Sequence, residues 1–389
     1  MKTRWILILL PLLLPAYVVR FHIGPLPTTL LEVALVVVLV AWAWMRRNEL
    51  KKILREFTKS RWYWPLGLWL CAGAIGIAIA SNHLAAFGLW RAYFIEPILV
   101  FIMLRDLVRT DKDKRDLLRS LSLVVATCAM YAIFQFVTHL GIPSPWGKPP
   151  QGIRATGPFP YPNALALFVV PAAVLFANLL IQKSKLVRQY WLWIGMISGL
   201  IAAVLAKSDG GLIAFTAAIF VILVLKKETR RYAITAAVIG SIVVLAVPQL
   251  RSIAEEQFLF KKWSGKVRLV MWGETKTMLA DRPLFGAGLG NYPTAIVPYH
   301  KATWMEIFQY PHNILLNLWS ETGLLGLVAF GWILFIWWRE GKMMALPVIT
   351  AIIVQGLVDV PYFKNDLAVM FWILVILTTT RIDEPGQVR

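Results

Sequence analysis

The stretch RLVMWGETKTMLADRPLFGAGLGNYPTAIVPYHKATWMEIFQYPHNILLNLWSETGLLG, residues 268–326, differs from the rest of the chain. It combines a long polar segment, paired basic residues, a glycine-rich turn and a histidine, His312, at the start of an apolar run. Most of the flanking sequence consists of apolar runs. Because chemistry requires polar groups, this stretch is the first place to look for a functional site.

The composition predicts an all-α membrane protein. Of the 389 residues, 58% are hydrophobic and only 16% are charged, whereas soluble domains carry about 25% charged residues. The mean hydropathy is +0.65. Apolar segments recur along the whole length, so we expect one polytopic helix bundle covering residues 1–389.

Each transmembrane helix needs about 20 mainly apolar residues. The opening residues resemble a signal peptide, but no small-x-small cleavage site follows and another apolar run comes almost at once. We therefore expect a retained first span. The sequence predicts about twelve spans, near 5–20, 26–44, 63–80, 88–104, 118–139, 163–181, 190–206, 211–225, 231–248, 313–337, 343–358 and 366–381.

The basic residues predict the orientation. Segment 46–61 carries seven Lys and Arg residues, segment 105–119 carries six and segment 226–231 carries four. The positive-inside rule makes these loops and both termini cytoplasmic. Further basic residues fall on the same side: Lys2, Arg4, Lys183, Lys185, Arg188, Arg339, Lys342 and Arg381. The outer face then holds 140–162, 207–210, 249–312 and 359–366.

This distribution also limits the partners. The net charge of +19 lies in short loops, where orientation and anionic lipid headgroups account for it, so we exclude nucleic acid and expect membrane lipids. The two cysteines, Cys71 and Cys128, lie in apolar runs and do not form a zinc or disulfide pattern. No cluster of outer-face carboxylates resembles a metal cage, so we expect no metal and no cofactor.

The outer loop 140–162 is rich in proline and glycine, which precludes regular helix and favours a shaped loop. Arg154 lies in it, and two interpretations are open. The guanidinium contacts lipid phosphate, or it binds a phosphate or pyrophosphate on a substrate. Asn163 follows Pro162 and is either a helix cap or part of the same site.

Two other outer loops carry charges. Lys207 and Asp209 either pair with each other or contribute to a substrate site. Asp366 precedes an apolar run and is expected to cap it. Asp359 lies at membrane depth, where an isolated carboxylate is costly, so we expect it to have a partner.

The segment 249–312 is too long for a plain connection, and its many aromatic residues are typical of a membrane interface or a sugar-binding face. Residues 267–280 form an amphipathic helix pattern that should end before Pro283. Arg268 and Trp272 stand one turn apart on it. The expected apolar stripe is Val267, Val270, Met271, Met278 and Leu279.

The end of this segment holds the clearest chemical signal. Glycines 286, 288 and 290 allow close approach of backbone to a ligand. His312 either caps the following helix or acts as a general base or hydrogen-bond donor at the outer boundary. The remaining histidines lack such a setting and are expected to be structural: His22, His83, His139 and His300.

These motifs resemble the O-antigen ligase/polymerase superfamily. The resemblance rests on RATGPFPYPNALALF (154–168), on 208–211, and on Arg268–Trp272, DRPLFGAGLGNY and HNILLNLWSETGLLGL within 268–326. One departure matters. Where the family often has Ser-Arg-Gly, this chain has Ser208, Asp209 and Gly210, so an arginine is lost there, and whether Lys207 replaces it is left open at this point.

The resemblance implies a metal-independent, inverting glycosyltransferase. It would transfer a glycan from a polyprenyl-pyrophosphate carrier to a hydroxyl of a glycan, lipid or protein acceptor, at the outer face of a bacterial cytoplasmic membrane. His312 and Arg268 would be catalytic, with Arg154 also gripping the pyrophosphate. The other residues it implies in substrate binding are Asn163, Trp272, Gly288, Asn291, Asn313 and Glu321.

Three alternatives remain at this point. A polymerase of lipid-linked repeat units would share the motifs. A transporter or flippase of the same lipid would also have about twelve spans, but transporters usually place polar groups near the bilayer midplane in repeated halves. A scaffold component of an envelope assembly would leave the Arg and His residues unexplained.

Overall fold

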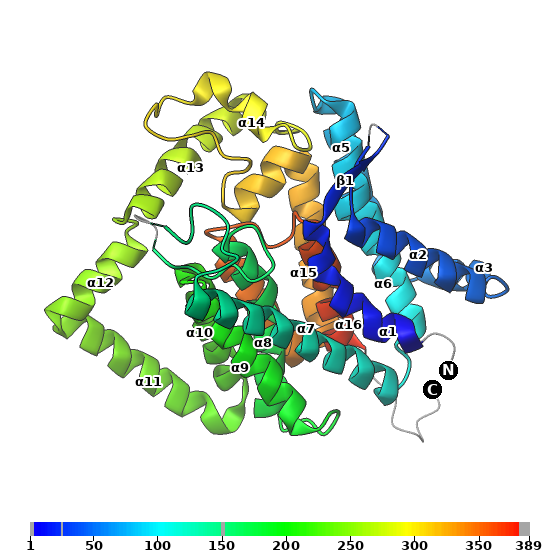
Figure 1. The fold of residues 1–389 in the computed structure, drawn as a ribbon, viewed down its shortest axis with the longest axis horizontal. Helices are drawn as coiled ribbons and strands as arrows, with labels where there is room; N and C mark the ends of the chain where they lie inside the picture. Colours follow the sequence, from blue (N-terminus) through cyan, green and yellow to red (C-terminus); the bar gives the residue numbers. More distant parts are fainter. Residues whose placement is uncertain (1–3, 25, 149–151, 381–389) are drawn as a thin grey trace.

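The computed structural model describes residues 4–24, 26–148 and 152–380, so Lys2 and Arg381, which we expected on the cytoplasmic side, lie outside the described residues. The chain is mostly helical (Figure 1). The first half contains α1 (Arg4–Leu13), η1 (Leu14–Val18), α2 (Leu30–Met45), α3 (Leu50–Thr58), α4 (Tyr63–Ile79), α5 (His83–Trp90), η2 (Arg91–Ile95), α6 (Glu96–Leu107) and α7 (Asp111–Thr138). The second half contains α8 (Pro162–Ile181), α9 (Gln189–Leu205), α10 (Asp209–Leu225), α11 (Lys227–Ala246), α12 (Pro248–Phe258), α13 (Trp263–Asp281), α14 (Tyr292–Ala295), η3 (Val297–Tyr299), α15 (Ile314–Gly356) and α16 (Asn365–Thr379).

A short β-hairpin departs from the all-α prediction. Strands β1 (Arg20–Ile23) and β2 (Leu26–Thr29) pair antiparallel, so the apolar segment expected to begin a helix near residue 26 begins as a strand. Pro27 has no N–H to donate to a helical hydrogen bond, and Thr29 is a residue type that favours the N-cap position. Helix α2 therefore starts only after Thr29. Thr29 and Glu32 form a reciprocal capping box at the start of α2.

The number of membrane spans is not confirmed at twelve. Each predicted apolar segment overlaps a helix. Within the part of the chain that the structure describes, however, five helices are long and apolar enough to cross a membrane, or six if α3 and α4, bent by 92°, form one span. The long helices are His83–Leu107 (α5, η2 and α6), α7, α8, α11 and α15. Five shorter apolar helices accompany them: Arg4–Val18, α2, α9, α10 and α16.

Helix α15 covers two predicted spans, 313–337 and 343–358, and has non-helical backbone at Gly323 and Lys342. Its two ends meet, because a Cβ atom at Gly356 would lie 2.7 Å from Cγ2 of Ile314. The chain therefore reverses near Lys342, between the two predicted spans. Gly323 has a positive φ of 67°, and a Cβ atom there would lie 2.3 Å from the carbonyl oxygen of Leu284. Only glycine fits this close approach without strain. The bend brings the first turns of α15 against the segment that follows α13.

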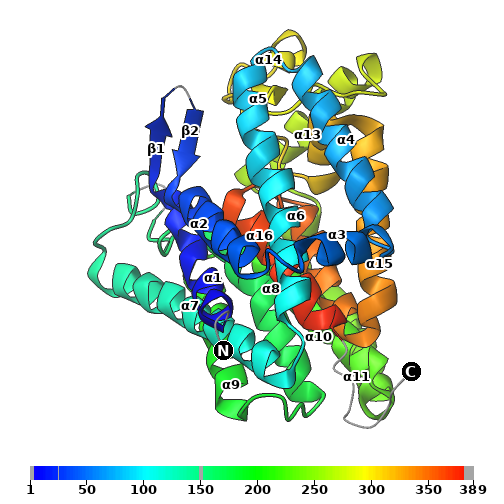
Figure 2. The ribbon, with the colours of Figure 1, turned by 90° about the vertical axis from the view of Figure 1, so that its right-hand side faces the viewer.

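Helix α8 lies at the centre of the bundle, and nearly all its side chains are buried. Near its C-terminal end, Asn178 donates from Nδ2 to the carbonyl of Met343, 3.0 Å away. By contrast, α12 has no buried side chain. Figure 1 shows α11, α12 and α13 following one another along one side of the molecule, and Figure 2 shows α13 and α14 at the same end as α4 and α5.

The prediction of a helix near 267–280 is confirmed. Helix α13 spans Trp263–Asp281 and ends two residues before Pro283. Four of the five residues of the expected stripe are buried, and Val270 is half-buried. The apolar face of α13 therefore packs inward, as its periodicity indicates.

One local prediction, the Asp366 cap, is wrong, and for Asn163 and for Lys207 with Asp209 the structure excludes one of the two alternatives. Tyr161 holds the N-cap position of α8, so Asn163 lies inside the first turn because Pro162 begins the helix. Asp366 also lies inside its helix, with Lys364 at the N-cap position. Asp209 pairs with Lys262, 3.5 Å away, and not with Lys207.

Candidate active site

Two consecutive residues after α15 anchor two of the predicted site residues. Arg268 of α13 donates from Nε to the carbonyl of Val358 at 3.0 Å, and from Nη1 to the carbonyl of Ser264 at 3.3 Å. His312 places Nδ1 3.3 Å from Oδ1 of Asp359. Neighbouring Cα atoms lie about 3.8 Å apart. The Arg268 guanidinium and the His312 imidazole are therefore held by two adjacent residues, Val358 and Asp359.

Arg154 reaches the same place from the loop before α8. Its Nε donates to the carbonyl of Ala206 at 3.1 Å, and its Nη2 donates to the carbonyl of Lys207 at 3.2 Å. That turn continues into Gly210, where a Cβ atom would lie only 2.7 Å from Cγ2 of Val358. The fold therefore brings Arg154, Arg268 and His312 together around Val358 and Asp359.

Two further contacts orient the Arg154 guanidinium. It lies over the ring of Trp146, 5.1 Å from the ring centroid. Its Nη2 also donates to Oδ1 of Asn163 at 3.4 Å. Asn163 thus contributes to the site by holding Arg154 from the first turn of α8.

Arg154 and Arg268 are two partly buried cations close to each other, and the pKa of each guanidinium is lowered. Burial lowers the pKa of Arg154, Asp209 opposes this, and the nearby charge of Arg268 lowers it further. Burial likewise lowers the pKa of Arg268, with Asp359 and Asp209 opposing. Like charges that are partly desolvated repel each other, so an anion bound between these guanidiniums would be stabilised.

The histidine–carboxylate pair has a defined geometry. Burial raises the pKa of Asp359, but the charge and hydrogen bond of His312, the charge of Lys364 and the Val360 N–H together lower it to about 2. Asp359 is therefore a carboxylate at neutral pH and accepts from Nδ1 of His312. Among the described residues, Nε2 of His312 has no hydrogen-bond partner, which leaves that nitrogen free for a substrate.

Sequence reasoning missed a second network beside His312. The hydroxyls of Tyr161 and Tyr310 lie 2.7 Å apart, and the Tyr310 ring centroid is 4.7 Å from that of His312. Lys364 donates to the Tyr161 hydroxyl and lies 3.9 Å from its ring centroid. Burial lowers the pKa of Lys364 to about 8. All three residues fall in predicted outer loops, and this shared location was the sequence feature that could have indicated a common site.

Trp272 and Asn313 flank His312 and hold its segment. Trp272 donates from Nε1 to the carbonyl of Pro311 at 2.8 Å. Asn313 caps α15 by accepting from the N–H groups of Leu315 and Leu316, and donates from Nδ2 to the carbonyl of Leu357 at 3.0 Å. His312 itself has a positive φ of 44°, a conformation that these flanking contacts maintain.

The other three predicted substrate-binding residues form a separate cluster. The carboxylate of Glu321 accepts from the Gly290 N–H at 2.6 Å, and Asn291 donates to the carbonyl of Ala287 at 2.9 Å. A Cβ atom at Gly288 would lie 2.7 Å from the backbone nitrogen of Ala80. These contacts pack the glycine-rich turn against the end of α4, and none of them joins the cluster to the arginines or His312.

Within residues 4–24, 26–148 and 152–380, no group of three or more His, Cys, Asp and Glu side chains is placed to hold a metal ion.

The apolar helices and the polar site at their ends define an integral membrane protein with an enzyme-like centre. Residues 194–331 match the family model described as O-antigen ligase, which confirms the resemblance to the O-antigen ligase/polymerase superfamily and supports a glycosyltransferase-like enzyme. No curated protein matches the chain. The matched residues include Arg268 and His312 but not Arg154 or Asp359, which join the site on geometry alone.

Proposed function

We propose that the protein transfers a glycan from a polyprenyl-pyrophosphate carrier to an acceptor hydroxyl at the outer face of a bacterial cytoplasmic membrane. The observation that carries the proposal is the convergence of Arg154, Arg268 and the His312–Asp359 pair on the Val358–Asp359 segment. Such an arrangement offers cations for a pyrophosphate and a base for a hydroxyl.

The two arginines bind the leaving group. Backbone carbonyls of Val358 and Ser264 hold the Nε and Nη1 of Arg268, and no described residue accepts from its Nη2. A guanidinium held in this way presents a planar fork that fits phosphate oxygens. As the glycosidic bond breaks, negative charge grows on the pyrophosphate, and these fixed cations stabilise it.

His312 activates the acceptor. The acceptor oxygen attacks the anomeric carbon while the bond from that carbon to the pyrophosphate oxygen breaks, and the bonding electron pair leaves with the pyrophosphate. The hydroxyl proton passes to Nε2 of His312, whose Nδ1–H donates to Asp359. A single displacement of this kind inverts the anomeric configuration. The two guanidiniums supply the charge that a metal ion would otherwise supply.

The test is a reconstituted assay with purified protein in vesicles, a polyprenyl-pyrophosphate-linked glycan and candidate acceptors, with products identified by mass spectrometry. We expect a glycosylated acceptor with an inverted linkage and released polyprenyl pyrophosphate, at a rate that EDTA leaves unchanged. A product joined to a second lipid-linked glycan would identify a polymerase. Donor moved across the bilayer without reaction would contradict the proposal and support a transporter.

A further inference from the structure

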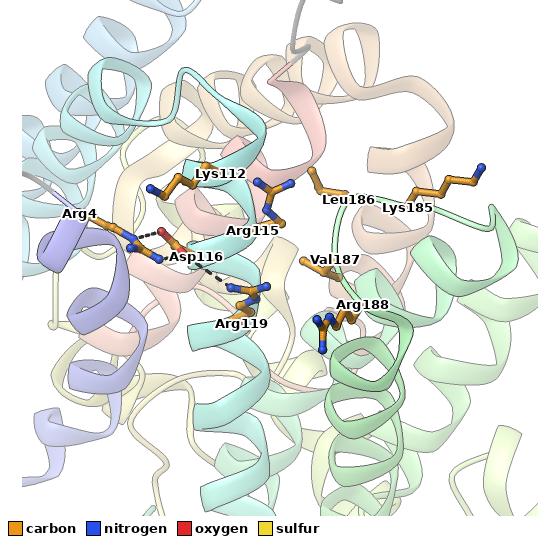
Figure 3. Close-up of a pocket in the computed structure, with 9 residues that line it drawn as sticks. All are labelled: Arg4, Lys112, Arg115, Asp116, Arg119, Lys185, Leu186, Val187 and Arg188. Carbon is orange, nitrogen blue, oxygen red and sulfur yellow. Dashed lines mark hydrogen bonds and ion pairs between the residues drawn. The ribbon is translucent and has the colours of Figure 1, made fainter. Parts of the chain in front are cut away.

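A polar cavity lies among the ends of three helical elements, far from the candidate active site. Its volume is about 460 Å³. Side chains from the start of α1, the first turns of α7 and the segment joining α8 to α9 surround it (Figure 3). Six of the lining residues are cationic and only Asp116 is anionic, so the lining carries a net charge of +5.

The cavity is organised around the buried Asp116. Arg4 donates to both carboxylate oxygens, from Nη2 at 2.9 Å and also from Nε, and Nη1 of Arg119 lies 3.9 Å away. The Nε of Arg119 is buried and has no hydrogen-bond partner within the described residues. One carboxylate cannot balance six cations, so the cavity has donors and positive charge available for an anion.

Its position places it at the opposite membrane boundary from the active site. Helix α8 begins beside Arg154 and ends at Ile181, shortly before the cavity residues Lys185 and Arg188. Twenty residues of helix span about 30 Å, which is the thickness of the bilayer hydrocarbon core. The basic loops that line the cavity are those that the positive-inside rule assigns to the cytoplasm.

An apolar groove lies beside α1, and Trp5, which follows the cavity residue Arg4 in the chain, lines it. It has a volume of about 510 Å³ and lies between α1 and α2, lined by Trp5, Val36, Val40, Trp44 and neighbouring side chains. A free phosphate makes no use of such a groove. A lipid places a charged phosphate at the membrane boundary and an acyl chain beside it, and thus matches both features.

We propose that this cavity binds the phosphate headgroup of an anionic phospholipid in the cytoplasmic leaflet, with an acyl chain along the α1–α2 groove. Orientation by positive charge alone does not require Arg4, Arg115, Arg119 and Arg188 to converge on one cavity around a buried carboxylate. The Arg119 guanidinium and the loop cations hold the headgroup, and the Arg4–Asp116 pair fixes the cavity wall.

The experiment is native mass spectrometry of the purified full chain, titrated with phosphatidylglycerol, phosphatidylcholine or inorganic phosphate. Two double variants test the cavity, Arg115→Gln with Arg119→Gln on α7 and Lys185→Gln with Arg188→Gln on the loop. The matched control, Lys51→Gln with Lys52→Gln on α3, removes the same charge outside the cavity. Removing a charge-assisted hydrogen bond to the headgroup should weaken binding roughly tenfold.

We expect phosphatidylglycerol to bind the wild-type protein and the control equally, and each cavity variant at least tenfold more weakly. If one cavity variant does not fold, the other decides. Equal weakening in the control, or equal binding of phosphatidylcholine, would overturn the proposal. Inorganic phosphate that displaces the lipid at equal concentration would show a free-phosphate site and would overturn the lipid assignment.

Discussion

At the scale of single residues, the role of each polar group follows from what it contacts. Asp359 is the clearest case, because its sequence context alone predicted a partner and the structure supplies His312. A buried carboxylate that orients an imidazole favours the tautomer in which Nδ1 carries the proton. Asp359 is therefore a positioning residue for the proposed base.

Changing Asp359→Asn should lower kcat roughly 100-fold, because the amide no longer favours the productive tautomer of His312. The KM for the lipid-linked donor should stay the same, since Arg154 and Arg268 hold the pyrophosphate. Initial rates at several donor concentrations separate the two constants. The conservative Asp359→Glu variant should recover part of kcat, and a rise in KM without loss of kcat would contradict this role.

Sequence motifs predicted Arg154, Arg268 and His312, and the fold brings them together. They did not predict Tyr161, Tyr310 and Lys364, because these residues meet only through contacts across more than 140 positions of sequence. Gly288, Asn291 and Glu321 lie near His312 in sequence, yet the fold uses them to pack against α4. Residues that are close in sequence therefore need not lie in the same site: Glu321, in α15, contacts the glycine-rich turn, whereas His312, just before α15, contacts Asp359.

At the scale of elements, the segment before α15 is positioned by α13. Trp272 connects the two through its hydrogen bond to Pro311, and its ring also packs against Phe260, with ring centroids 5.3 Å apart. The boundaries of α13 were predictable because an apolar stripe and Pro283 define them. The hydrogen bond from Trp272 to Pro311 was not predictable, because the apolar periodicity of the helix does not determine which way the indole N–H points.

Changing Trp272→Phe should keep the ring packing but remove the indole N–H. We expect a loss of about 1 kcal/mol in the free energy of unfolding and a several-fold decrease in kcat, because the His312 segment is less well held. The matched control is Trp263→Phe on the same helix, whose ring packs on Trp304. Equal loss of kcat in both variants would show that ring size, and not the hydrogen bond, is responsible.

The segment His300–Ala302 is held against α13 by hydrogen bonds to Glu274, and these depend on pH. Burial opposes ionisation of Glu274, but hydrogen bonds from His300, Lys301 and Ala302 lower its pKa below 4.5. The hydrogen bond from Glu274 raises the pKa of His300 above 6.5. The stabilisation from Glu274 is present above pH 4.5 and is lost as pH falls. The stabilisation from His300 is complete below pH 6.5 and is lost as pH rises.

Hydrogen exchange of the Lys301 and Ala302 amides, which donate to Glu274, should therefore show most protection between pH 4.5 and 6.5 once intrinsic rates are corrected. In His300→Gln the loss of protection at higher pH should disappear, because that side chain does not titrate. An unchanged loss at higher pH in this variant would assign the effect to another group.

At the scale of the whole molecule, composition and apolar periodicity predicted a helical membrane protein, and the structure agrees. The number of spans was harder to predict because five apolar helices among the described residues have only 10–17 residues. The β1–β2 hairpin was missed because apolar content alone does not distinguish a short strand from the start of a helix. Hydropathy therefore predicts the class better than the topology.

Orientation has its own test in variants that lack both Cys71 and Cys128 and carry one introduced cysteine. Lys276→Cys on α13 should react with a membrane-impermeant maleimide in right-side-out vesicles. Lys51→Cys on α3 should react only after permeabilisation, because the positive-inside rule places segment 46–61 in the cytoplasm. The reverse pattern would place the arginines and His312 on the inner face and would make an outer-face transfer impossible.

The central claim is that the arginine and histidine groups carry out glycan transfer, and one measurement tests it most directly. Wild-type protein and the variants His312→Ala and Arg268→Ala are reconstituted at equal, verified amounts with a polyprenyl-pyrophosphate-linked glycan and its acceptor. We predict transfer by the wild type and none detectable in either variant, since a base contributes roughly 10²–10⁴-fold and the leaving group loses its cation. Retained transfer in both folded variants would contradict the account.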